Sequence, residues 1–156
     1  MRKFFLTVGF SGLSPKAPGT IGSIVALVLG MLLLQVISLS TLFLLAILIS
    51  VFSVKQIDIY EKEVGAHDGS EIVIDELAGM WIALAIASAT ADNYIIAGLA
   101  FVYFRLFDIW KPSLIGKIDR DVKGGWGVMG DDMLAGLFAG LCTSMTYFLL
   151  IKYNLL

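Results

Sequence analysis

Cysteine, histidine and charge are all scarce in this sequence of 156 residues. It has one cysteine, Cys142, and one histidine, His67, so neither a disulfide framework nor a Cys/His zinc cluster can form. Lys, Arg, Asp and Glu make up 15% of the residues, against the roughly 25% that is usual in soluble domains. The net charge of -2 comes from acidic and basic residues that are interleaved, without the basic stripe typical of nucleic-acid binding, so no nucleic-acid partner is expected.

Hydrophobic residues dominate the sequence instead. They make up 58% of the chain, and the mean hydropathy is +0.90. This composition is typical of a membrane protein, and the length fits a single domain that covers residues 1–156. We therefore predict an all-α fold, a compact polytopic membrane helix bundle whose polar loops cluster on one face.

Five apolar runs are candidates for the helices of this bundle: residues 21–37, 41–54, 77–91, 94–107 and 133–151. At about 1.5 Å per residue the runs extend roughly 20 to 28 Å, close to or below the roughly 30 Å hydrocarbon core, so several are marginal spans. The first two runs are separated only by Ser38-Leu39-Ser40, which fits either a tight hairpin or a kink in one long helix. We predict about five apolar helices.

Small residues recur at four-residue spacing within two of these runs. They are Gly22, Ala26 and Gly30 in the first run and Gly136 and Gly140 in the last. Such ridges let helices approach closely in lipid, so we interpret them as packing surfaces.

Nearly all charged residues fall in three polar stretches between the runs. The stretches are residues 1–20, 55–76 and 111–132, with Arg105 and Asp108 just before the last. If each run crosses the membrane, the three stretches meet on one side, and the turns near Ser38 and Asp92 meet on the other. Every Lys and Arg except Lys152 lies on the side of the stretches, so the positive-inside tendency places that side in the cytoplasm.

Two acidic pairs are candidate metal ligands. Asp75-Glu76 begins an apolar run, and Asp131-Asp132 follows the glycine-rich segment 124–130, which favours a tight bend that carries the pair to a helix N-terminus. Acidic residues also favour helix starts without any ligand. Four carboxylates at one mouth of the bundle nevertheless suit a hard cation with oxygen ligands. We predict that these four residues bind Mg²⁺.

Cations and backbone amides lie near these acids in the predicted topology. Arg105, Asp108 and Lys111 are spaced i, i+3, i+6, roughly along one side of a helix, which suits a phosphoryl group bound beside a metal. The same spacing fits a salt bridge with cations at a helix end. The Gly-rich segment 9–23, which contains Lys16, fits either a phosphate cradle at a helix N-terminus or a simple helix cap.

Four segments, taken together and in this order, carry a family resemblance: SPKAPGT at 14–20, IVIDE at 72–76, FRLFDIWKP at 104–112 and GVMGDD at 127–132. The set resembles the phosphatidylglycerophosphatase A family over about residues 9–140. Members of that family are Mg²⁺-dependent bacterial inner-membrane enzymes that remove the terminal phosphate of phosphatidylglycerophosphate and leave phosphatidylglycerol. The resemblance thus implies a phosphoric monoester hydrolase, a multi-pass protein with its active site facing the cytoplasm and its substrate in the bilayer.

The resemblance also implies roles for the polar residues. Asp75, Glu76, Asp131 and Asp132 would be catalytic residues that hold Mg²⁺, one of them acting as a base. The phosphate would be bound by Lys16, Arg105 and Lys111 and by backbone N–H groups near Gly19 and Thr20. Asp108 would orient Arg105 or complete the metal shell. The segment 60–70 matches the family least, so His67 is either a solvated loop residue or a proton relay.

Other functions fit parts of the sequence. A non-enzymatic carrier subunit or assembly factor would use the same carboxylates to bind a cation, but it leaves Arg105 and Lys111 unexplained. A CDP-alcohol phosphatidyltransferase also acts on lipids with Mg²⁺, but its Asp-Gly-x-x-Ala-Arg signature is absent. No Arg follows Cys142, which excludes a cysteine phosphatase, and the single histidine excludes the multi-histidine lipid phosphatases.

Overall fold

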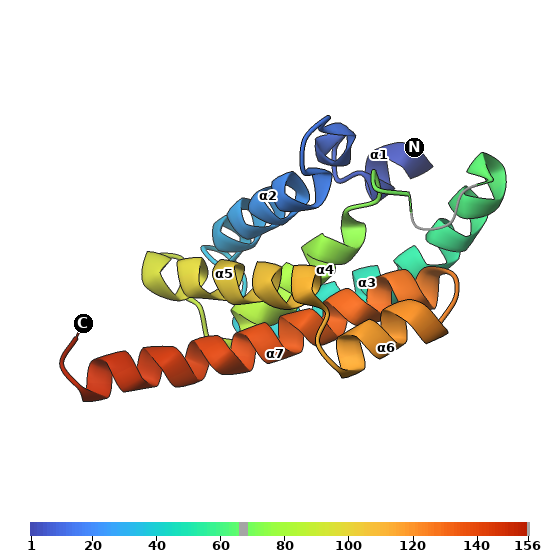
Figure 1. Cartoon of the computed structure of the whole chain (residues 1–156). Helices are drawn as coiled ribbons and strands as arrows, with labels where there is room; N and C mark the ends of the chain where they lie inside the picture. The colour runs from blue at the N-terminus through green and yellow to red at the C-terminus, as the bar shows by residue number, and fades with distance from the viewer. Residues whose placement is uncertain (66–68, 156) are drawn as a thin grey trace.

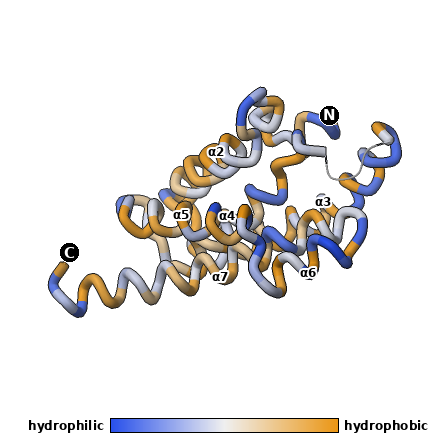
Figure 2. Tube along the Cα trace, in the orientation of Figure 1, coloured by the Kyte–Doolittle hydropathy of each residue, from blue (hydrophilic) through white to orange (hydrophobic). Residues whose placement is uncertain are grey.

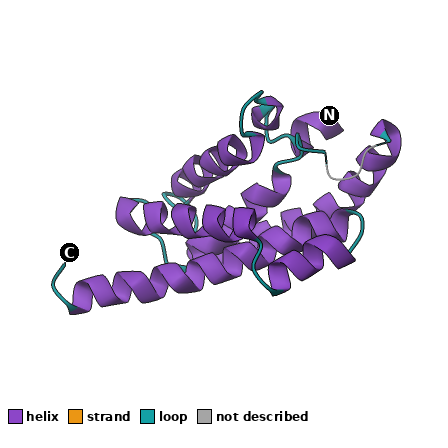
Figure 3. Cartoon of the chain, viewed as in Figure 1, coloured by secondary structure: helices purple, strands orange, loops and turns teal. Residues whose placement is uncertain are grey.

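The computed structural model describes residues 1–65 and 69–155, and all regular structure in those residues is helical (Figures 1 and 3). The elements are α1 (Arg2–Leu6), the 3₁₀ helix η1 (Ser11–Leu13), α2 (Pro18–Leu33), α3 (Leu39–Val64), α4 (Ile74–Ile86), α5 (Tyr94–Trp110), α6 (Leu114–Asp121) and α7 (Gly125–Lys152). The all-α prediction is therefore confirmed. His67 lies outside the described residues, so its role stays open.

Each of the five apolar runs forms a helix, but the prediction of about five apolar membrane helices is not confirmed. Among the described residues, only α3 and α7, with 26 and 28 residues, are long and apolar enough to cross a membrane, and α2 is a shorter apolar helix. The 13 residues of α4 extend only about 20 Å, well short of a hydrocarbon core. Two candidate spans and the surface described below are consistent with a membrane protein.

The outward faces of α3 and α7 are apolar. Leu48 on α3 is 65% exposed, and Met145 and Phe148 on α7 are 67% and 63% exposed. Figure 2 shows that hydrophobic residues predominate along the long helices, while many of the hydrophilic segments gather around α6 and the beginning of α4. Large exposed apolar surfaces are costly in water, so these faces are suited to a lipid environment.

The first two apolar runs form separate helices. Helix α2 ends at Leu33, and Ser38 caps α3 by accepting a hydrogen bond from the backbone N–H of Thr41 at 3.2 Å. This excludes a kink in one long helix. Helix α3 then continues ten residues past the apolar run, through the charged segment 55–64, and ends at Gly65 in the left-handed conformation (φ 72°).

The glycine-rich segment before the second acidic pair is mostly helical, so the predicted tight bend at 124–130 is wrong. Only Gly124 has a positive φ (69°), and α7 begins at the next residue, which places Asp131 and Asp132 in the second turn rather than at the helix N-terminus. The glycines serve packing instead: a Cβ on Gly125 would collide with the backbone of Val54 in α3. The contact is fixed by Asp58, whose Oδ1 accepts a hydrogen bond from the Gly125 N–H at 2.7 Å.

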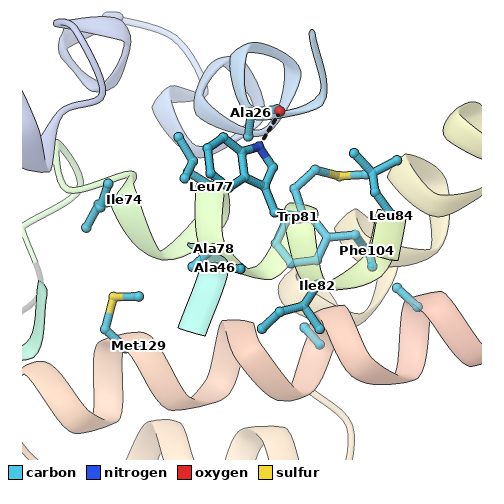
Figure 4. Close-up of a cluster of buried hydrophobic side chains, with 14 of the residues drawn as sticks. Ala26, Ala46, Ile74, Leu77, Ala78, Trp81, Ile82, Leu84, Phe104 and Met129 are labelled. Atoms are coloured by element: carbon cyan, nitrogen blue, oxygen red, sulfur yellow. Dashed lines mark hydrogen bonds between the residues drawn. The ribbon is translucent and has the colours of Figure 1, made fainter. Parts of the chain in front are cut away.

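Helix α4 forms the centre of the bundle and is buried along nearly its whole length (Figure 4). Its Trp81 donates a hydrogen bond from Nε1 to the carbonyl oxygen of Ala26 in α2 at 2.9 Å. A Cβ on Gly30 would lie only 2.7 Å from Leu84, and one on Gly22 would lie 2.6 Å from Val73. The small residues of α2 are thus a packing ridge, as predicted.

Two glycines bring α4 and α7 into backbone contact. A Cβ on Gly136 would collide with the carbonyl oxygen of Gly79, and one on Gly79 would lie 2.5 Å from the carbonyl oxygen of Asp132. A Cβ on Gly140 would likewise lie 2.6 Å from Ile86. The ridge on α7 is therefore also a packing surface, and it holds Asp132 against the beginning of α4.

We expect Gly136→Val to destabilise the protein by about 3 kcal/mol, because the added atoms overlap backbone that cannot move aside cheaply. The measurement is the thermal unfolding midpoint in detergent. The matched control is Gly98→Val on α5, since a Cβ there would meet no heavy atom of the described residues within 4 Å apart from its chain neighbours and the backbone of its own helix. Equal midpoints for the two variants would show that the α4–α7 contact is not as tight as described.

Candidate active site

A cavity of about 220 Å³ lies where α2, α4, α5, α6 and α7 meet. The cavity is lined by the charged side chains of Asp75, Glu76, Asp108, Lys111, Asp119, Asp131 and Asp132, and by Ser70 and, from α2, Gly19. These residues come from all three polar stretches of the sequence. The structure therefore brings the stretches together at one site, as the topology argument predicted.

Three carboxylates of the cavity form a compact group. Asp75, Glu76 and Asp132 each offer one oxygen, and these oxygens lie within 4.8 Å of one another. Asp75 Oδ1, Glu76 Oε2 and Asp132 Oδ2 are buried and have no hydrogen-bond partner among the described residues. Buried carboxylate oxygens without partners are costly, and a shared hard cation would satisfy all three. The donor set thus fits Mg²⁺.

Asp131, the fourth predicted ligand, is held differently from the other three. Its Oδ2 accepts a hydrogen bond from the ammonium of Lys111 at 2.6 Å, and its Oδ1 is buried without a partner within the described part of the chain. Asp131 lies outside the three-residue group, although it lines the same cavity. Its predicted role as a metal ligand stays a prediction.

Lys111 ends α5 in the left-handed conformation (φ 45°), which turns it out of the helix line that the i, i+3, i+6 spacing predicted. Its ammonium is paired with both Asp119 and Asp131. Burial lowers the pKa of Lys111, but these two partners outweigh burial and raise the pKa above its usual value. Lys111 is therefore a fixed positive charge at neutral pH.

Arg105 bridges α5 and the beginning of α2. Its guanidinium is paired with Asp108 one turn later in α5, and it donates hydrogen bonds to Thr20 Oγ1 at 3.3 Å and to Ser23 Oγ at 3.2 Å. A salt bridge between Arg105 and Asp108 was one of the two interpretations of their spacing in the sequence. The structure forms this salt bridge, and Asp108 lines the cavity. An oriented guanidinium in this position suits recognition of phosphate oxygens.

Gly19 is required to be small at the cavity wall. A Cβ there would collide with Glu76 Oε1 and lie 3.4 Å from Arg105 Nη1, so any side chain would separate the acidic group from the cation. The preceding turn places Lys16 at the surface, and Lys16 is not among the described residues that line the cavity. The predicted contact between Lys16 and phosphate is therefore not seen and stays a prediction.

Two residues of the site were not predicted from the sequence. Ser23 is fully buried and donates to the carbonyl oxygen of Gly19 at 2.7 Å while it accepts from Arg105. Asp119 pairs with Lys111 from α6, a helix that falls within the stretch 111–132. The three-residue spacing of Ser23 from Thr20 on one helix was a usable signal for Ser23, whereas the position of Asp119 depends on the turn after Trp110.

We expect Ser23→Ala to lower the activity of the site about tenfold, because Arg105 loses one of its orienting hydrogen bonds. The control is Ser50→Ala, since Ser50 is also buried and donates to a carbonyl four residues earlier, at 2.8 Å, but it lies far along the chain on α3 and has no bond to Arg105. The measurement is kcat and KM, determined separately for each variant. Equal losses in the two variants would assign Ser23 a purely structural role.

The charge balance of the cavity is strongly negative. Among the described residues that line it, six are acidic and only one, Lys111, is a cation. Arg105 lies behind the wall of the cavity, paired with Asp108. Such a site repels an anionic substrate unless a bound cation offsets the excess. Fold and site together define a helical, lipid-compatible protein whose charged cavity is suited to a metal ion and a phosphorylated ligand.

Comparison with known proteins gives the family. The sequence profile of the Phosphatidylglycerophosphatase A family matches residues 4–147. The chain belongs to this family, a family of phosphoric monoester hydrolases, which confirms both the resemblance and the enzyme class expected from the sequence. No solved structure matches the chain.

Three curated relatives cover most of the chain. Phosphatidylglycerophosphatase A of Escherichia coli is 42% identical over 139 residues, which cover 86% of this chain and 77% of the relative. The protein of the same name from Haemophilus influenzae is 37% identical over 135 residues, 86% of this chain and 82% of the relative. A protein of Bacteroides thetaiotaomicron, provisionally named phosphatidylinositol-3-phosphatase, is 39% identical over 137 residues, 83% of this chain and 82% of the relative.

Proposed function

We propose that this protein is a Mg²⁺-dependent lipid phosphatase that hydrolyses the terminal phosphomonoester of phosphatidylglycerophosphate to phosphatidylglycerol and phosphate. Family membership supports the reaction, and two relatives carry the name of this activity. The single observation that supports the mechanism is the group of carboxylates with buried, unpartnered oxygens in one cavity, with Lys111 lining that cavity and Arg105 held behind its wall by Asp108.

Asp75, Glu76 and Asp132 would hold the metal. Their oxygens lie close enough together to share one ion, and each residue has one oxygen that is buried from solvent. When bound, Mg²⁺ supplies positive charge that neutralises the phosphate and lowers the pKa of a water molecule. The three residues would also keep the ion at a fixed distance from Arg105, since Gly19 leaves no side chain between Glu76 and the guanidinium.

Arg105 and Lys111 would bind the phosphate oxygens and stabilise the charge that is spread over them in the transition state. Asp108 and Ser23 hold the guanidinium in place, and Asp119 and Asp131 hold the ammonium. Both cations are therefore oriented before substrate arrives, so little reorganisation is needed during the reaction.

In the reaction, water attacks the phosphorus on the side opposite to the glycerol oxygen. The bond between phosphorus and that oxygen breaks, and the oxygen takes up the proton that the attacking water gives up. Phosphatidylglycerol leaves, and inorganic phosphate, which keeps the oxygen and the second proton of the water, remains. The unpartnered Oδ1 of Asp131 offers a hydrogen-bond acceptor that would orient the attacking water.

The substrate would stay in the bilayer while its phosphate enters the cavity. The apolar outer faces of α3 and α7 support a position in the membrane, and the distribution of Lys and Arg supports a cytoplasmic active site in the bacterial inner membrane. Arg105 and Lys111 also favour hydrolysis over the alternative of a non-enzymatic carrier subunit or assembly factor, because cation binding alone gives no reason to place guanidinium and ammonium groups beside the acids.

The test is phosphate release by purified, detergent-solubilised protein from phosphatidylglycerophosphate, with Mg²⁺ and with excess chelator. We expect release that requires Mg²⁺. Phosphatidylinositol 3-phosphate belongs in the same assay, because one relative carries a name that refers to that lipid. Preferred hydrolysis of the inositol lipid would replace the proposed substrate, and release that is insensitive to chelator would overturn the metal mechanism.

A further inference from the structure

An apolar groove between α2 and α5 has no role in the chemistry described above. It has a volume of about 360 Å³. Its walls include Leu27 and Met31 from α2, Gln35 just after the end of α2, and Tyr94, Ala97 and Gly98 from α5. On the α5 side the groove is bordered by two small residues, Ala97 and Gly98. Apart from Gly98 itself, its two chain neighbours and the backbone of its own helix, no heavy atom of the described residues lies within 4 Å of the position that a Cβ on Gly98 would take, so the groove is open at that point.

The groove continues the line of the phosphate-binding residues along both helices. Gly98 precedes Arg105 by seven residues, and Leu27 follows Thr20 by seven residues, so each pair lies on one face of its helix, two turns apart. Arg105 and Thr20 are hydrogen-bonded to each other across the same two helices. The crevice between α2 and α5 therefore has the guanidinium of Arg105 at one end and the apolar groove about two helical turns further along.

The dimensions match one leaflet of a membrane. From Arg105 to Tyr94 the rise along α5 is about 16 Å. Half of a hydrocarbon core is about 15 Å, which is the length available to an acyl chain in one leaflet. A phosphorylated head at Arg105 would thus place a chain of ordinary length along the whole groove.

We propose that the groove between α2 and α5 binds an acyl chain of the lipid whose phosphate occupies the active site, so that the protein measures chain length as well as head group. This inference rests on the proposed phosphatase function. The occupant is a hydrocarbon chain because Leu27, Met31 and Ala97 offer only apolar contacts, and because the crevice is headed by a cation that suits the phosphate of the same molecule.

The test uses Gly98→Phe, which adds a bulky ring to the wall of the groove at a position where a Cβ has open space. We expect KM for dipalmitoyl phosphatidylglycerophosphate, expressed as mole fraction in detergent micelles, to rise about tenfold, since several methylene contacts are lost. The dioctanoyl substrate should change less than about twofold, because a chain half as long ends near the level of Gly98, about 10 Å from Arg105. Matched controls are Gly98→Ala and Val51→Phe, the latter at a position that is 57% exposed on α3, away from the groove.

A second measurement does not depend on turnover. A dipalmitoyl substrate with a diazirine near the chain end should label the segments 27–35 and 94–98, as read by mass spectrometry. Labelling confined to other lipid-facing helices would overturn the inference. So would a Gly98→Phe variant that behaves like Val51→Phe, or one with a normal melting midpoint whose KM rises equally for the two substrates. If the wild type hydrolyses neither lipid, the proposed function fails, and the labelling pattern still decides whether the groove holds a chain.

Discussion

Replacement of Asp132 by Asn should lower kcat for phosphate release about a thousandfold while the protein stays folded. Asp132 offers one of three clustered carboxylate oxygens, and its Oδ2 is buried without a partner within the described chain. An amide keeps the shape of the side chain but removes the charge that a hard cation requires. The loss should therefore come from the metal rather than from packing.

Binding of Mg²⁺ provides a separate readout for the same variant. Wild-type protein should gain thermal stability as Mg²⁺ is added, because a ligand that binds only the folded state stabilises it. Asp132→Asn should lose most of this gain and should be at least as stable as wild type without Mg²⁺, since one buried charge is gone from an acidic group. Asp92→Asn is the control, because Asp92 lies outside the three polar stretches. A Mg²⁺ response that survives in Asp132→Asn would exclude this residue as a ligand.

Arg105→Lys should lower kcat/KM about a hundredfold although it keeps the positive charge. The guanidinium is paired with Asp108 and donates hydrogen bonds to Thr20 and Ser23 at the same time. An ammonium is a point charge that cannot keep this set of contacts and also present two donors to a phosphate. Lys is chosen rather than Ala because Asp108 is half-buried, and removal of the positive charge at residue 105 would leave its carboxylate without an ion-pair partner.

The matched control for this variant is Arg120→Lys, at an exposed position near the end of α6. Activity should be unchanged there. The kinetic split is informative, because loss of an interaction made mainly in the transition state lowers kcat and kcat/KM together. An effect on KM alone would mean that Arg105 binds the ground state and the transition state equally.

Much of the fold was accessible from the sequence because the relevant signals are local. Each apolar run forms a helix, and the ridges headed by Gly22 and Gly136 are packing surfaces. The extent of the helices was less accessible. Helix α3 continues through charged residues, and α7 begins within a glycine-rich segment, because contacts such as Asp58 with Gly125 outweigh the local preference for a turn.

The candidate site divides in the same way. Its acidic pairs and cations could be found by their segregation from the apolar runs. Asp119 could not be found in this way, since its pairing with Lys111 depends on the turn between α5 and α6. Ser23 had only the signal of its spacing from Thr20, because its partner Arg105 lies far along the chain. The sequence also could not separate Asp131, which is paired with Lys111, from the three acids that form the compact group.

The sequence by itself therefore determined the class of the molecule: apolar helices, and three charged stretches separate from them. Hydrophobicity and charge are properties of single segments, so they can be read without knowledge of the neighbours. Only the tertiary structure decided which charges meet. The close contact of Gly79 with Gly136 places Asp132 beside Asp75 and Glu76, and the absence of a side chain at Gly19 lets Arg105 approach them. Such contacts depend on ångström-scale packing between distant segments.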